Sequence, residues 1–380
     1  MKKILFIHNK YRHIGGEDTA VNQEIALLKE VYDVKVIIFE NTIKNYFWQT
    51  LYFLTNKNLN SKKILQEALN DFKPDVAYIH NTWFKASLVV FTLLKKNNVE
   101  ILLKLHNFRY YCTKSFLLKT HLNRNTQCPA CGIKRNKGKL FNKYFQDSYL
   151  RSLFVIFYGK LYYKILKEFK IKVLVLTEFH KQFIKNLDLK NDQIYVYPNY
   201  VELKVNEKPS NEKYILYAGR ISREKGVERV IISYNNSGLK DTKLKIIGVG
   251  PEYERLKKKY KNIIFLGEMK NKEVLEIISK ASAVISATRL LEGQPMLLCE
   301  ASSMAVPSIF PKTGGIEEFF PENYELSFIQ FDYVDLSRKI KLLDNRELCK
   351  KVGQENYDFI SKFYSKKSIL RKFEKILHAK

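Results

Sequence analysis

The sequence has few of the features that membrane-spanning and secreted proteins require. Its longest uncharged apolar-rich stretch, 45–56, has twelve residues, whereas a spanning helix needs about 20. Near the N-terminus only Ile4 to Ile7 are apolar before His8, which is too short for a signal-peptide core. Five cysteines in 380 residues are an odd number that does not suit a disulfide framework. We therefore expect a cytoplasmic protein with reduced thiols or a metal site.

Acidic residues are scarce relative to basic ones. Lys and Arg total 66 against 39 Asp and Glu, which gives a net charge of +27. This surplus predicts an anionic partner, which could be nucleic acid, a membrane surface or a phosphate-bearing substrate. The segment from Lys104 to Lys172 holds 16 basic residues against Asp147 and Glu168, and so carries +14 of the total.

Length and hydrophobic patterning predict two α/β domains. At 380 residues and 46% hydrophobic content, the chain exceeds what one core usually holds. Short apolar runs alternate with helical patterns, and the alternation restarts after a polar linker at 207–212. The expected strands cover 4–7, 34–39, 75–80, 100–105, 173–177, 214–218, 244–247, 263–266, 283–286 and 306–310. We expect two Rossmann-like doubly wound domains, 1–200 and 201–356, facing a central cleft.

One helical stripe within the basic segment allows two interpretations. It comprises Leu150, Phe154, Phe157, Leu161 and Ile165, and basic residues surround it. The stripe can face the core of an ordinary amphipathic helix. Alternatively, it can form a membrane-surface patch in which aromatics insert at the level of the lipid headgroups.

Two carboxylates, Glu292 and Glu300, flank the stretch Gly293-Gln294-Pro295-Met296. Pro295 suits the start of a helix, because a proline in the first turn loses no intrahelical hydrogen bond. Glu292 is then expected in the loop before the helix and Glu300 on its second turn. A loop acid beside a helix N-terminus can hold a polyhydroxyl ligand and its phosphate.

Glycine-bearing loops follow the expected strands of the second half. Gly219, Arg220 and Lys225 come directly after the first of these strands, and the two cations suit a diphosphate. The further loops contain Gly250, the Leu266 to Glu268 stretch, and 313–318. Ligands of open α/β sheets bind at such strand ends.

Together, in this order and spacing, these motifs resemble those of the retaining GT-B glycosyltransferases of glycosyltransferase family 4, over nearly the whole chain. The resemblance implies that Arg220 and Lys225 bind the donor diphosphate, that Glu292 contacts the donor sugar and that Glu300 holds the ribose. It also implies that the final helical segment, 357–380, packs back on the first domain. The expected donor-binding residues are Gly15, Gly16, Gly219, Arg220, Lys225, Gly250, Leu266, Glu268, Glu292, Gly293, Gln294, Pro295, Met296 and Glu300.

The first half agrees with this resemblance. Gly15 and Gly16 are similar to the family's flexible glycine loop, where the missing Cβ lets backbone approach phosphate. His106, at a strand end, matches a histidine beside the reacting sugar, so the expected catalytic set is His106, Glu292, Arg220 and Lys225. His80 also ends a strand, and we expect a structural role for it.

Two substitutions depart from the family pattern, and a cysteine cluster lies outside the donor motifs. Gln294 replaces a frequent aromatic residue, and Ala305 a frequent glycine. Cys112, Cys128 and Cys131 form a three-thiol cluster that some bacterial members share. With His121 it could hold structural zinc, but a single Cys-x-x-Cys favours reduced or redox-reactive thiols.

The resemblance implies retaining sugar transfer from a nucleotide-sugar, a UDP-sugar or else a GDP-sugar, without a required cofactor or metal. No Asp-x-Asp occurs in the chain. The expected acceptor is a lipid-linked or growing saccharide in capsule, lipopolysaccharide or other polysaccharide biosynthesis. We expect peripheral binding to the anionic inner membrane surface and no nucleic-acid partner.

Three alternatives stay open: a non-catalytic sugar- or lipid-binding scaffold of the same fold, a nucleic-acid-binding protein, and a nucleotide-sugar epimerase. The glycine loops and paired acids would have no purpose in a nucleic-acid-binding protein, and the Glu292 to Glu300 pattern favours transfer over epimerisation.

Overall fold

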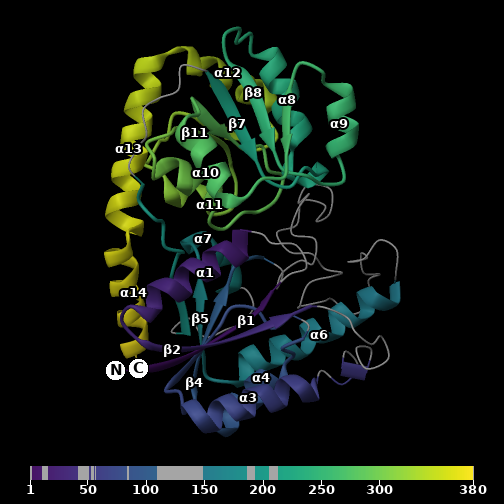
Figure 1. The fold of residues 1–380 in the computed structure, drawn as a ribbon, viewed down its shortest axis with the longest axis vertical. Coiled ribbons are helices and arrows are strands. Elements are labelled where there is room, and N and C mark those ends of the chain that lie inside the picture. The colour runs from purple at the N-terminus through teal and green to yellow at the C-terminus, as the bar shows by residue number, and fades with distance from the viewer. Residues whose placement is uncertain are drawn as a thin grey trace. The chain divides into compact units, whose positions relative to one another are not determined.

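The computed structural model describes residues 2–10, 16–41, 51–52, 55, 57–83, 85–108, 149–185, 193–204 and 213–379. The chain forms two compact units (Figure 1). The first contains Met1–Tyr200 and Leu370–Lys380, and the second contains Val201–Ile369. In the described part of the chain, each unit holds one six-stranded sheet in which every strand pairing is parallel.

The first sheet has the order β2-β1-β3-β4-β5-β6. Its strand order reverses between β1 and β3, which is the switch point where ligands of such sheets bind. The elements are β1 (Lys3–Lys10), α1 (Gly16–Lys29), β2 (Asp33–Glu40), α3 (Leu59–Phe72), β3 (Val76–Ile79), α4 (Val89–Lys96), β4 (Glu100–Leu105), α6 (Tyr149–Glu168), β5 (Ile171–Val175), α7 (Glu178–Lys185) and β6 (Ile194–Val196).

The second sheet has the order β12-β11-β10-β7-β8-β9, the Rossmann order read from its far edge, with its switch point between β7 and β10. The elements from Tyr214 to the C-terminus are β7 (Tyr214–Ala218), η2 (Arg223–Lys225), α8 (Val227–Asn236), β8 (Lys243–Ile247), α9 (Tyr253–Lys259), β9 (Ile264–Gly267), α10 (Asn271–Ser279), β10 (Ala283–Ile285), α11 (Met296–Ser302), β11 (Ser308–Lys312), η3 (Ile316–Phe319), β12 (Ser327–Ile329), α12 (Tyr333–Lys341), η4 (Leu342–Asp344), α13 (Arg346–Tyr364) and α14 (Lys366–His378). The prediction of two doubly wound α/β units is confirmed.

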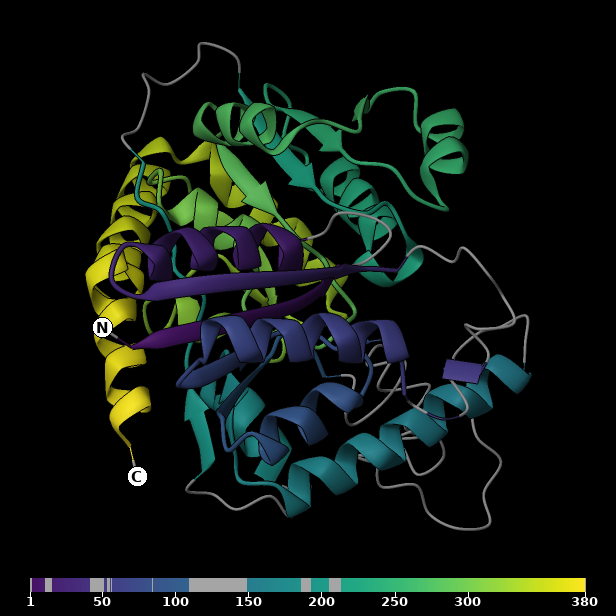
Figure 2. The ribbon, with the colours of Figure 1, turned by 60° about the horizontal axis from the view of Figure 1, so that its bottom comes forward.

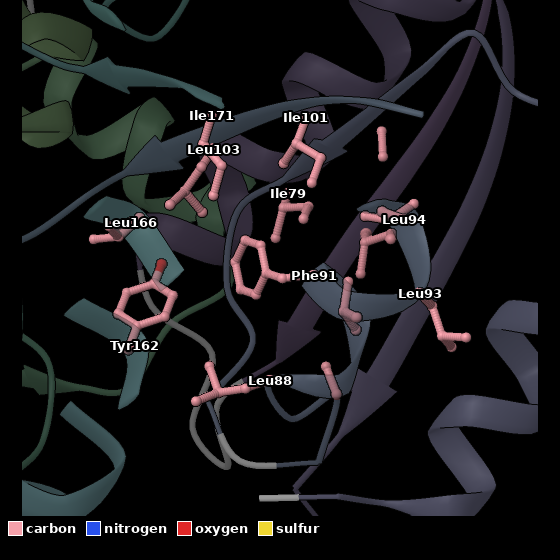
Figure 3. Packing of buried hydrophobic residues seen from close by; sticks show 14 of the residues in the cluster. Ile79, Leu88, Phe91, Leu93, Leu94, Ile101, Leu103, Tyr162, Leu166 and Ile171 are labelled. Carbon is pink, nitrogen blue, oxygen red and sulfur yellow. The ribbon is translucent and has the colours of Figure 1, made fainter. Parts of the chain in front are cut away.

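Helices cover both faces of the first sheet, which explains why its strands read as continuous apolar runs. Figure 2 shows α1 on one side and α3, α4 and α6 on the other. On the latter side, Phe91 of α4 lies among Ile79, Leu103 and Tyr162 (Figure 3). These side chains belong to one buried hydrophobic cluster, which holds the helices on the sheet.

The buried face of α6 differs from the predicted stripe. Among the α6 side chains that the structure describes, Tyr158, Tyr162 and Leu166 are buried, whereas Phe157 is 45% exposed. Leu161 and Ile165 are partly buried at the margin of this face. The side chains of Leu150 and Phe154 lie outside the described residues. Within the described ranges, no helix has the length and apolar character needed to span a membrane.

The last segment is two helices rather than one over 357–380. α13 ends at Tyr364, Ser365 adopts extended backbone, and α14 follows. Only the part from Leu370 onward belongs to the first unit. There Phe373 lies 5.3 Å from Tyr78 and 5.4 Å from Tyr197, measured between ring centroids. The predicted segment 357–380 therefore divides between the units at Ile369.

Gly226 places the start of α8 against the loop after β10. Its φ is +71°, and an added Cβ would lie 1.9 Å from the Ala287 carbonyl oxygen. A side chain there would therefore combine left-handed strain with a backbone clash.

We expect Gly226→Ala to lower the free energy of unfolding by about 2–5 kcal/mol, the sum of left-handed strain and overpacking. Gly238→Ala is the matched control, because its φ is +70° and nothing lies within 4 Å of the added Cβ. We expect the control to lose only about 1–2 kcal/mol. Urea unfolding of the full chain measures both changes. Equal losses would contradict the close approach.

Candidate active site

The loops at the carboxyl ends of β7, β8 and β9 are joined backbone to backbone. The Gly219 N–H donates to Ile247 O at 3.0 Å, and the Gly248 N–H donates to Gly267 O at 2.6 Å. An added Cβ on Gly248 would lie 2.0 Å from Gly219 O, and one on Gly250 would lie 2.4 Å from Ile221 O. The predicted glycine loops therefore form one continuous edge, because backbones this close leave no room for side chains.

The loop after β10 is tied to the same edge. The Arg289 N–H donates to Glu224 O at 2.9 Å, beside the Gly226 contact. The Lys225 Nζ lies 2.7 Å from Glu292 Oε1, and the Thr288 hydroxyl donates to the same oxygen at 2.9 Å. The Lys225 and Glu292 side chains are 34% and 23% exposed. The cation expected to bind diphosphate and the acid expected to bind sugar thus form one partly exposed ion pair.

The backbone around Glu292 is fixed by the loop after β11. The Gly315 N–H donates to Glu292 O at 2.9 Å. Gly314 has a φ of +60°, and its added Cβ would lie 2.1 Å from the same oxygen. Gln330 also donates to Thr288 O and Leu290 O, at 3.2 and 3.4 Å. Sequence reasoning missed Gln330, since an isolated glutamine after a short strand carries no motif.

The helix that follows the Glu292 loop, α11, begins at the position that the sequence predicted. Pro295 is its N-terminal cap residue, and Pro295 O accepts from the Leu298 and Cys299 N–H groups at 3.0 and 3.1 Å. Gln294 is buried, with its amide nitrogen 3.9 Å from Cys299 Sγ. Met296 starts the helix and Glu300 lies on its second turn. A glutamine can occupy the place of an aromatic residue here because it packs into the start of α11.

The other predicted residues of this unit lie at the same edge. Arg220 is exposed, and its carbonyl accepts from the Tyr217 hydroxyl at 3.0 Å. Leu266 is 39% exposed and sits at an irregularity of the ladder, where Ile246 pairs with Phe265 and Ile247 with Gly267. Glu268 follows on the surface. An irregularity of this kind turns backbone groups out of the regular ladder.

Polar side chains also gather at the switch point of the first sheet. The His80 Nδ1 lies 2.8 Å from His106 Nε2, after β3 and β4 respectively. His8, near the end of β1, lies with its Nε2 3.0 Å from Asp18 Oδ1 of α1. Burial, with the nearby Lys104 charge, holds the pKa values of His80 and His106 well below the ordinary value. Both rings are therefore neutral near pH 7.

A buried ion pair lies behind these histidines. The Lys104 Nζ is 2.8 Å from Glu24 Oε2, and the Tyr78 hydroxyl donates to Glu24 Oε1 at 2.6 Å. The Lys104 and Glu24 side chains are 0% and 3% exposed. Sequence reasoning missed this pair, although a lysine inside the apolar run 101–105 and a glutamate among Val21, Ile25 and Leu28 were visible signals.

Several predicted residues cannot be placed. Gly15, Cys112, Cys128 and Cys131 lie outside the described residues, while Gly16 begins α1. Among the residues that are described, no three or more His, Cys, Asp or Glu side chains form a group suited to a metal ion.

Comparison with known proteins agrees with this geometry. Residues 201–359 match the model of the family Glycosyl transferases group 1. The chain is 23% identical to the uncharacterized glycosyltransferase MJ1069 of Methanocaldococcus jannaschii over 99% of this chain and 98% of that protein. It is 28% identical to the amylovoran biosynthesis glycosyltransferase AmsD of Erwinia amylovora over 54% of this chain and 62% of AmsD.

Residues 201–359 of the second unit match the Glycosyl transferases group 1 family, and the protein is a glycosyltransferase similar to the members of this family. Its two units have the GT-B fold, and Anabaena Alr3699/HepE in complex with UDP-glucose aligns with a TM-score of 0.70 at 15% identity over 99% of each chain. As a glycosyltransferase of the retaining family 4, the protein uses a nucleotide-sugar.

In this glycosyltransferase, burial raises the pKa of Glu300 to about 7, although Lys204 and a hydrogen bond with Asn271 oppose the shift. The carboxyl group is therefore partly protonated at neutral pH. The resemblance implies that Glu300 holds the ribose, and the ionised carboxylate is the stronger acceptor for the hydrogen bonds that a ribose diol donates.

We expect affinity for a nucleoside diphosphate to rise with pH through about 7 and then level off. Below that pH, protonation leaves a weaker acceptor, and affinity falls by at most about tenfold per pH unit. Calorimetric titration across this range measures the slope. Glu300→Gln, which keeps the shape but does not titrate, separates this slope from that of the ligand's own phosphate. An unchanged slope in this variant would show that Glu300 does not hold the ribose.

Proposed function

We propose that this glycosyltransferase takes its sugar from a UDP-sugar and transfers it, with retention, to a hydroxyl of a lipid-linked or growing saccharide. The observation that carries the proposal is the pairing of Lys225 with Glu292 at the switch point of the second sheet. A cation for diphosphate and an acid for sugar hydroxyls, side by side, fit the two halves of a nucleotide-sugar.

The proposed chemistry needs electrostatic stabilisation more than a protein nucleophile. The bond between the sugar's anomeric carbon and the diphosphate oxygen breaks while the acceptor oxygen bonds to that carbon on the same face. The acceptor's proton passes to the departing diphosphate oxygen. Arg220 and Lys225 stabilise the charge that develops there, and Glu292 holds the sugar hydroxyls. On the first unit, His106 contacts the sugar.

The choice of donor and acceptor rests on relatives and on charge. Alr3699/HepE is described in complex with UDP-glucose, which supports a UDP-sugar, and AmsD is described as an amylovoran biosynthesis enzyme, which supports a polysaccharide pathway. The +14 charge of residues 104–172 supports an anionic acceptor or the anionic inner face of a membrane.

Equilibrium binding of UDP, GDP, ADP and CDP tests the donor assignment. We expect selective binding of UDP, lost in the Arg220→Ala/Lys225→Ala variant because two of the diphosphate's cations are removed. Selective GDP binding would replace UDP by GDP in the proposal. A folded protein that binds none of the four would overturn the donor site.

Glu292→Gln tests the ion pair and separates binding from transfer. A diphosphate must compete with Glu292 for Lys225, so removing that charge is expected to tighten UDP binding by about 1.4- to fivefold, as a partly exposed pair contributes ~0.2–1 kcal/mol. Transfer is expected to fall by about 100-fold or more, because a group at the reacting centre is lost. Titration calorimetry and sugar-transfer assays measure the two effects.

Glu276→Gln is the matched control, because this carboxylate also pairs with a lysine, Lys280 at 2.7 Å, on the surface of α10. We expect neither binding nor transfer to change. Full transfer activity in Glu292→Gln would contradict the assignment of Glu292 to the sugar.

A further inference from the structure

We propose that His80 and Glu24 are positioning residues that fix His106 with a proton on Nε2 and a lone pair on Nδ1. The role of His106 toward the sugar rests on the proposed function. The relay consists of a hydrogen bond between His106 and His80 and an electrostatic contact between His80 and Glu24, and it stands on the geometry of the first unit alone. The relay runs from α1 through the end of β3 to the end of β4.

Distances and stacking define the relay. The His106 Nε2 lies 2.8 Å from His80 Nδ1, and the opposite nitrogen of His80, Nε2, lies 3.7 Å from Glu24 Oε2. The His80 side chain is fully buried and stacks on Phe6 at 4.5 Å and on His106 at 5.0 Å between ring centroids. Water therefore has no access to the His80 ring, and its neighbours alone decide where its proton lies.

Glu24 is present as a carboxylate. Both of its oxygens accept hydrogen bonds, one from the Tyr78 hydroxyl at 2.6 Å and one from the Lys104 ammonium at 2.8 Å. A buried lysine with a carboxylate at this distance is a charge-assisted pair, and removal of either partner would leave the other uncompensated.

The carboxylate sets the direction of the relay. If His80 carried its proton on Nδ1, the lone pair of Nε2 would face the Glu24 oxygen, which is repulsive. With the proton on Nε2, a partly positive N–H group lies 3.7 Å from the carboxylate oxygen instead, which is favourable, and Nδ1 becomes an acceptor. That acceptor at 2.8 Å requires a donor, so His106 must carry its proton on Nε2.

Neither His80 nor His106 takes up a second proton near neutral pH, so each ring carries one proton, on one of its two nitrogens. The groups around the pair are Glu24, Lys104, His8, His180 and Tyr78, and the burial of both rings keeps their pKa values low. His106 therefore presents a lone pair on Nδ1. It accepts a hydrogen bond from a sugar hydroxyl and does not donate one, which defines the polarity of the sugar contact.

Long-range proton–nitrogen NMR of the full-length protein labelled with ¹⁵N-histidine tests the relay without any substrate, because protonated and lone-pair ring nitrogens resonate far apart. We expect protonated Nε2 and lone-pair Nδ1 on both His80 and His106. Protonated Nδ1 on His80 with lone-pair Nε2 on His106 would overturn the proposal.

Two sets of variants test each link. In His80→Phe the stacking ring remains but the acceptor is lost, so the hydrogen-bonded Nε2 proton of His106 should exchange rapidly with water. His80→Asn places an amide oxygen where Nδ1 was and should restore its protection. Glu24→Gln/Lys104→Met removes the buried charges together, which avoids an uncompensated charge, and should abolish the uniform proton placement on His80. An unchanged His80 spectrum in the double variant would exclude Glu24 as the cause.

Kinetics distinguish positioning from folding. We expect His80→Phe to lower kcat about 10- to 100-fold, the loss typical of a misoriented group, and His80→Asn to recover most of it. In a His106→Ala background the same His80→Phe change should have no further effect. A loss of equal size in that background would show that His80 does not act through His106. The NMR result stands whether or not the protein transfers the proposed sugar.

Discussion

A parallel sheet that is covered by helices on both faces leaves its strand ends as the main place for functional polar groups. Both units obey this constraint. Most of their strands are buried runs, and polar side chains collect at the carboxyl edge beside the switch points, between β1 and β3 and between β7 and β10. His80 and Glu292 occupy equivalent places in their own units for this reason.

The second constraint is the close approach of loop backbones at that edge. Gly226, Gly248 and Gly314 each lie so close to the carbonyl oxygen of a neighbouring loop that an added Cβ atom would clash with it. The Lys225 to Glu292 pair is therefore positioned by backbone contacts on either side of it. Such positioning is set on folding and requires no rearrangement of the main chain when a ligand arrives.

The sequence predicted the fold and the glycine loops, but it predicted few of the long-range side-chain contacts between them. Strands and glycine loops have local patterns, so their order identified both units and the edge at which Arg220, Lys225 and Glu292 lie. The direct Lys225 to Glu292 pair spans 67 positions and the Glu24 to Lys104 pair spans 80, and no local pattern encodes such pairings. The exposed Phe157 shows a different failure, since aromatic residues on both sides of α6 blur its period.

The backbone conformation of Ala305 explains why the family often has a glycine at this position. The resemblance marked it as an alanine in place of a frequent glycine, without a reason. Its φ of +56° gives one, because this left-handed conformation favours glycine. The departure therefore concerns backbone strain at the end of α11 and carries no information about which sugar is bound.

The ion pairs Glu24–Lys104 and Lys225–Glu292 differ in burial, and therefore in the free energy that is needed to break them. Breaking a buried pair such as Glu24 with Lys104 costs about 3–5 kcal/mol, because the remaining charge stays in a low-dielectric interior. A partly exposed pair such as Lys225 with Glu292 contributes about 0–1 kcal/mol, so a diphosphate can take the lysine and leave the carboxylate to water or to a hydroxyl. The buried pair is suited to hold a proton in one place on the first unit. The exposed pair is suited to exchange partners during a reaction, because an anion that bound Lys225 would release the Glu292 oxygen that now pairs with it.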